Sequence, residues 1–210
     1  MKESLDIQDD RSYFIAMSKR EDKKDHLLDS GLEVMKSQGY NGTSVKDIVE
    51  AAGVPKGSFY NYFESKEVFA IEALEKTALE GFKQAQVELT LSQNPPLERL
   101  AAFFTSNTDN ACDGKFKVGC FLGNMCQEMA DSSEDIRLKI KYLLRQHTLL
   151  IESVLKQAQA DGEISNSTDT SVMAEFIFNA WQGSLMRMKA SKCREPLDAF
   201  LQILPGLLKS

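Results

Sequence analysis

Apolar residues recur at helical spacing along most of this 210-residue chain. Between 21 and 38 they predict one helix, and Gly39 predicts where that helix ends. Ser44, followed three residues later by Asp47, is close to a capping box and predicts a second helix that runs to Gly53. A short third helix is expected over 55–62, because proline suits the first turn of a helix.

The remainder of the chain shows the same periodicity, and it has neither sustained strand alternation nor an internal repeat. Further helices are predicted over 65–91, 97–112, 120–130, 134–161, 169–191 and 196–209. The chain is therefore expected to be all-α, with about nine helices. We expect three parts: a flexible N-terminal tail over 1–18, a helix-turn-helix domain over 19–66 and a second helical domain over 67–210.

Composition indicates a soluble globular protein, with 42% hydrophobic and 27% charged residues. The formal net charge of −6 argues against nucleic-acid binding by the whole surface. A small DNA-reading element remains compatible with it, because such an element needs only a local patch. The stretch 18–66 holds eight basic and eight acidic residues, so the negative charge lies in the rest of the chain.

Three short helices with a glycine-containing turn between the second and third form a helix-turn-helix pattern. In that motif the helix after the turn enters the major groove of DNA. Lys56 stands at its start and can reach a phosphate or a guanine edge, and Gly57 lets the backbone approach DNA closely. Other polar groups of the segment are available for contact: Ser58, Tyr60 and Asn61. Phe59 and Phe63 are expected to point inward, and a purely structural three-helix core remains the alternative.

The sequence resembles the N-terminal domain of tetracycline-repressor-type (TetR) regulators in three runs: Thr43–Ile48, Ala52–Phe63 and Ser65–Glu67. The resemblance implies that the second helix approaches the DNA backbone through Thr43, Ser44 and Lys46. It also implies DNA contacts from the third helix through Lys56, Gly57, Ser58, Tyr60, Asn61 and Tyr62, and phosphate binding by Lys66. Asn61 departs from the histidine that many members carry.

The resemblance further implies a C-terminal domain that binds a ligand and forms a homodimer through its last two helices. The apolar stripes in 172–188 and 197–208 are broader than one buried face requires, which favours a second subunit over an internal core. Two recognition helices reading two half-sites would also strengthen DNA binding. A ligand cavity in the C-terminal domain would be lined by Phe103, Phe104, Phe121, Met125, Phe178 and Trp181. The alternative is that these residues simply form the core.

The cysteines at 112, 120, 126 and 193 form no CxxC pair, and no secretory segment precedes them, so a reducing cytoplasm is expected. No apolar run of about 18 residues predicts a membrane span. His26 and His147 stand far apart in sequence, so neither a zinc site nor a histidine-based catalytic site is predicted. We expect no cofactor, no metal and no enzymatic activity.

A narrower similarity, to repressors of N-ethylmaleimide-reductase-type genes, rests on Gly119-Cys120, Ser133–Arg137, Lys189 and Glu195–Leu197. It implies a sensor of electrophiles or oxidants at Cys120, assisted by Lys189. A predicted helix start at Cys120 agrees with this, because helix N-termini favour thiolates. A buried structural thiol is the alternative.

Together these patterns predict a cytoplasmic transcriptional repressor that binds a palindromic double-stranded DNA operator as a homodimer. A small-molecule ligand, or modification of a cysteine by an electrophile or oxidant, would release it. The alternative is a helical small-molecule-binding protein or enzyme that does not bind DNA.

Overall fold

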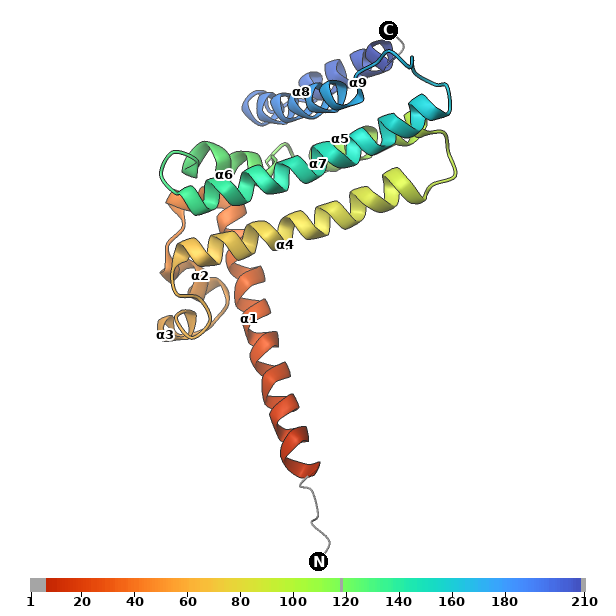
Figure 1. The fold of residues 1–210 in the computed structure, drawn as a ribbon. Coiled ribbons are helices and arrows are strands. Elements are labelled where there is room, and N and C mark those ends of the chain that lie inside the picture. The colour runs from red at the N-terminus through yellow and green to blue at the C-terminus, as the bar shows by residue number, and fades with distance from the viewer. Residues whose placement is uncertain (1–6, 118, 209–210) are drawn as a thin grey trace, which may run out of the picture. The chain divides into compact units, whose positions relative to one another are not determined.

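The computed structural model describes residues 7–117 and 119–208, with side chains from residue 20 onward. This part of the chain is helical and contains no strand (Figure 1). The elements follow in the order α1 (Ile7–Gly42), α2 (Val45–Ala51), α3 (Lys56–Phe59), α4 (Lys66–Gln86), the π-helical segment η1 (Val87–Leu91), α5 (Pro96–Asp113), α6 (Phe121–Met129), α7 (Glu134–Ala160), α8 (Thr170–Ser191) and α9 (Glu195–Leu208). None of these described helices is both long enough and apolar enough to cross a membrane.

The prediction of an all-α chain with these helices is confirmed, and two boundaries need correction. Helix α1 begins at Ile7, so the described part of the expected tail, 7–18, is helical; residues 1–6 lie outside the described residues. Helix α3 ends at Phe59 rather than at 62. The amide of Asn61 donates to the Ser58 carbonyl, and the chain continues as a tight turn instead of an α-helix.

The chain divides into two compact units, 1–73 and 74–210, where the sequence predicted a boundary after residue 66. The difference arises because the first two turns of α4 belong to the core of the first unit. Phe69 of α4 is fully buried there, and its ring centroid lies 5.8 Å from that of Phe59 and 5.0 Å from that of Phe63.

Two glycines shape the first unit. Gly39 interrupts α1 with a φ of 76°, a conformation that favours glycine, and this turns the chain toward α2. Gly31 lies where α1 packs most closely, because a Cβ built on it would be 2.6 Å from both Ile48 Cγ2 and Phe69 Cζ. Other buried apolar residues of the first unit include Leu27, Leu28, Leu32, Met35 and Val49.

In the second unit, α8 packs against α7 and α9, and α5 packs against α7 and α9 (Figure 1). Three buried aromatic side chains from these helices form its centre. The ring centroid of Phe104 lies 5.1 Å from that of Trp181 and 4.9 Å from that of Phe200. Arg99 is also buried and donates hydrogen bonds to the Leu89 carbonyl and the Gln157 side chain, which ties η1 to α7.

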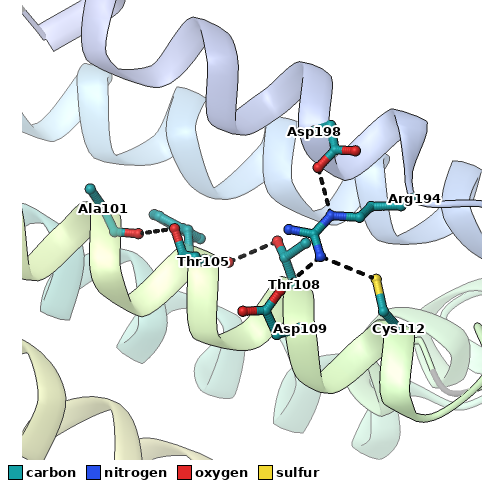
Figure 2. Close-up of polar contacts among 8 residues, drawn as sticks. Ala101, Thr105, Thr108, Asp109, Cys112, Arg194 and Asp198 are labelled. Atoms are coloured by element: carbon teal, nitrogen blue, oxygen red, sulfur yellow. Dashed lines mark hydrogen bonds and ion pairs between the residues drawn. The ribbon is translucent and has the colours of Figure 1, made fainter.

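A polar contact joins the end of α5 to the start of α9 (Figure 2). Arg194 Nη1 lies 2.8 Å from Asp109 Oδ1, and Arg194 Nε lies 2.7 Å from Asp198 Oδ1. Cys112 Sγ is 4.0 Å from Arg194 Nη1. Since these ion pairs are largely exposed, they fix the position of the α9 N-terminus more than they stabilise the fold.

Candidate nucleic-acid interface and ligand cavity

A complete capping box fixes the N-terminus of α2. The Ser44 amide donates to Asp47 Oδ2 at 2.8 Å, and the Asp47 amide donates to Ser44 Oγ at 3.2 Å. Hydrogen bonds from Ser44 lower the pKa of Asp47, so the cap is ionised at neutral pH. The Ser44 hydroxyl also donates to Asp47, so its first role is to hold α2 in place.

The segment that includes α3 presents polar groups outward and aromatic rings inward. Phe59 and Phe63 are buried, as predicted, and anchor the segment to the core. Lys56, Gly57 and Asn61 are exposed, and Tyr60 is 57% exposed. Ser58 and Tyr62 are half-buried, whereas Lys46 on α2 is exposed and pairs with Glu50 at 3.6 Å. The exposed groups therefore form a polar surface held by two buried phenylalanines.

Two predicted contact residues stabilise the turn between α1 and α2 instead. Thr43 is 1% exposed, and its hydroxyl donates to the Gly39 carbonyl at 2.6 Å, so this side chain holds the turn, and its DNA contact stays a prediction. Lys66 Nζ donates to the carbonyls of Tyr40 at 2.9 Å and Thr43 at 3.0 Å, and it lies 4.0 Å from the centroid of the Tyr40 ring. These contacts set the direction in which α2 leaves the turn, and phosphate binding by Lys66 stays a prediction.

A cavity of about 390 Å³ lies within the second unit, between α4, α5, α6, α7 and α8. This volume falls in the range of small-molecule pockets. Five of the six residues predicted to line a cavity do so: Phe103, Phe104, Phe121, Phe178 and Trp181. Met125 on α6 is buried and is not among the lining residues.

The cavity also has polar lining residues that the sequence did not indicate: Thr77, Gln84, Asn107, Asn110, His147 and Gln182. The His147 ring stacks on that of Phe178, with centroids 5.8 Å apart. Burial lowers the pKa of His147, so the ring is neutral at pH 7. Helical periodicity marks apolar faces, and it gave no signal for polar residues that face an internal space.

An open groove of about 460 Å³ lies between α4 and α7. Its lining residues are Glu75, Ala78, Leu79, Phe82, Tyr142, Leu143, Gln146 and His147. Ala78 and His147 line both the groove and the cavity. These two side chains therefore border both spaces.

Cys120 is the N-cap of α6, where a helix start was predicted, and it is half-buried on the cavity wall. Lys189 packs against the neighbouring Gly119, because a Cβ built on Gly119 would lie 3.6 Å from Lys189 Cδ. Cys112, Cys126 and Cys193 are half-buried too, but they are not among the lining residues. The geometry thus singles out Cys120 as the thiol that a molecule in the cavity would meet.

An N-terminal helix-turn-helix unit followed by a helical unit with an internal cavity defines a class of DNA-binding transcriptional regulators. Comparison with family models specifies the class: residues 27–73 match the bacterial regulatory proteins of the tetR family, and residues 96–204 match the tetracyclin repressor-like C-terminal domain. The chain belongs to the TetR family. It is a transcriptional regulator and not an enzyme, which decides against the alternative of a helical protein without DNA binding.

Individual relatives agree with this assignment. The chain is 34% identical to the HTH-type transcriptional repressor DhaR of Mycobacterium sp. (strain GP1), over 86% of this chain and 89% of DhaR. The regulatory protein TetR from Rhodobacter sphaeroides has a solved structure with a TM-score of 0.80 and 31% identity, covering 87% of this chain and 96% of that one. The reduced form of E. coli NemR also gives a TM-score of 0.80, with 26% identity over 87% of this chain and 95% of NemR.

Proposed function

We propose that the protein is a cytoplasmic transcriptional repressor that binds a palindromic operator as a homodimer and is released by an effector in the cavity. The exposed polar surface of α3 and the following turn, anchored by Phe59 and Phe63, is the observation that carries the DNA-binding part. With a net charge of −6, affinity must come from a few placed contacts and from dimerisation rather than from general attraction. Two such surfaces would read half-sites about 34–36 Å apart.

Exposed apolar side chains on the last two helices support dimerisation. Val172 is 65% exposed and Phe176 55% exposed on α8, and Ile203 is 66% exposed on α9. Covering such residues with a second copy would remove apolar surface from water. Sedimentation velocity on the full chain should show a dimer, and Phe176→Glu should shift it toward monomer, because the partner would bury an unpaired charge. A wild-type monomer at operator-binding concentrations would contradict this assembly.

DNA binding is tested by gel shift with the promoter of the protein's own gene. Lys56→Ala and Tyr60→Ala should each weaken binding about tenfold or more, because each dimer loses two contacts of about 1–3 kcal/mol. Lys141→Ala and Tyr142→Ala are matched controls on α7, since both residues are exposed and lie outside the first unit. Equal losses in the controls, or no sequence-selective and salt-sensitive binding by the wild type, would refute the proposal.

The effector part includes modification of Cys120. N-ethylmaleimide is a suitable probe: the thiolate sulfur adds across its ring double bond, and the proton ends on the adjacent ring carbon. A variant with Cys112, Cys126 and Cys193 replaced by serine keeps Cys120 as the sole thiol. We expect alkylation to release this variant from the operator and to leave a Cys120→Ser variant bound. Equal release of both would remove Cys120 from the mechanism.

Lys189 is proposed to assist Cys120 by holding a positive charge near the reacting sulfur, since its chain packs along Gly119. Lys189→Met would keep the packing and remove the charge. The rate of alkylation at Cys120, followed by mass spectrometry, should fall in this variant. An unchanged rate would leave Lys189 a packing residue only.

A further inference from the structure

The lining of the cavity carries no formal charge. Its residues include no Asp, Glu, Lys or Arg, and its histidine, His147, is kept neutral at pH 7 because burial lowers its pKa. An ionised group entering this space would lose its hydration without gaining a partner of opposite charge. The lining therefore selects against charged molecules.

Thr77 on α4 differs from three threonines of α5 and α7 in the described chain. The hydroxyls of Thr105, Thr108 and Thr148 each donate to the carbonyl four residues earlier, as Figure 2 shows for the first two. Thr77 Oγ1 is buried and has no hydrogen-bond partner among the residues that the structure describes, and Thr77 lines the cavity. A buried hydroxyl without a hydrogen-bond partner lowers stability, so a ligand that accepts a hydrogen bond from it gains affinity.

Two other donors on the wall, the side-chain amides of Asn107 and Gln84, are already engaged. The side-chain amide of Asn107 donates to the Phe103 carbonyl at 2.8 Å, and that of Gln84 donates to Glu88 at 3.0 Å. A hydrogen bond from Thr77 to a ligand would therefore break no existing bond. Around Thr77 the lining is aromatic and aliphatic, which suits flat apolar groups.

We propose that the effector is an uncharged, largely apolar molecule whose carbonyl oxygen accepts a hydrogen bond from the Thr77 hydroxyl. This inference rests on the proposed function, because it takes the cavity to be the effector site. In this proposal Thr77 selects for ligands that carry a hydrogen-bond acceptor. Binding requires no reaction with Cys120.

Three probes of matched shape test the proposal by isothermal titration of the full chain. 2-Acetylnaphthalene is neutral and has a carbonyl oxygen, 2-isopropenylnaphthalene replaces that oxygen by a methylene group, and 2-naphthoate is an anion. We expect the ketone to bind best and the hydrocarbon to bind about tenfold more weakly, because one hydrogen bond is lost. The anion should bind at least about a hundredfold more weakly than the ketone, because its charge is buried unpaired.

Variants assign the effect to Thr77. In Thr77→Val the ketone and the hydrocarbon should bind equally, whereas Thr77→Ser should retain a preference for the ketone. Thr108→Val is the matched control, because Thr108 is buried on α5 and does not line the cavity. Its preference for the ketone should equal that of the wild type, and circular dichroism checks that each variant is folded.

The proposal is overturned if no probe binds, if the anion binds as well as the ketone, or if Thr77→Val keeps the wild-type preference. Operator binding by the same preparations is measured separately by gel shift. Loss of the probe preferences with intact operator binding refutes this inference and leaves the DNA-binding function standing. Intact probe preferences without operator binding would support this inference about the cavity and refute the DNA-binding function.

Discussion

Replacing Gly31 by alanine tests the packing that positions the DNA-binding segment. The added Cβ would lie 2.6 Å from Ile48 Cγ2 and 2.6 Å from Phe69 Cζ, and 3.2 Å from Ile48 Cγ1. Both neighbours are 0% exposed, so neither side chain has free space into which it can move. Helix α1 must therefore shift away from α2 and α4, or the two side chains must adopt strained conformations.

The cost can be worked from these contacts. Overpacking a filled core costs about 1–3 kcal/mol, and two contacts with buried, branched or ring atoms place this site at the upper end. Alanine recovers about 1 kcal/mol of that loss, because it favours the helix over glycine. We expect a net loss of about 2 kcal/mol, which lowers the melting temperature of a chain of this size by about 4–8 °C.

Gly57→Ala is the matched control, because a Cβ built on Gly57 has no atom within 4 Å. Circular dichroism melts should show no loss of stability in this variant, and gel shifts should show weaker operator binding, because the methyl group holds the backbone away from DNA. A Gly31→Ala variant that melts at or above the wild-type temperature would refute the packing argument. Unchanged operator affinity in Gly57→Ala would refute close approach of the α3 backbone to DNA.

Three further outcomes are expected. Ser44→Ala should cost about 1 kcal/mol in thermal melts, because it removes the α2 cap. Lys66→Met should lower both stability, by about 1–2 kcal/mol, and operator affinity in gel shifts, because the turn at Tyr40 and Thr43 loses two hydrogen bonds from a half-exposed ammonium. Below pH 6.5 the unfolded chain protonates at His147 more readily than the folded chain does, so its contribution to stability is present above this pH and lost as pH falls. Acidification should therefore lower the melting temperature of the wild type more than that of His147→Gln.

Local signals predicted the fold well where one residue type determines the backbone. Ser44 with Asp47 located the start of α2, and Gly39 located the break in α1, because capping and a positive φ are local requirements. The length of α3 was overestimated, since the tight turn after Phe59 follows from packing of Phe63 and Phe69 rather than from residues 60–62 themselves.

Site residues were harder to predict because their environment is tertiary. Thr43 belongs to the matching motif, yet its burial follows from the fold of the turn back toward Gly39. The aromatic lining of the cavity was mostly anticipated, because large apolar residues on facing helices must meet. Thr77 and His147 were missed as lining residues, since no pattern along one helix shows which polar side chain faces an internal space.

Ala78 and His147, the residues that the cavity and the groove share, bear on how fast the protein can respond to an effector. Both residues line the cavity and also the open groove between α4 and α7. Reorientation of individual side chains takes place far faster than separation of packed helices, which takes microseconds to milliseconds or longer. Exchange of an effector past these two side chains would need no helix to unpack, so occupancy of the cavity would follow changes in effector concentration promptly. The duration of a transcriptional response would then be set by the dissociation rate of the effector from its pocket.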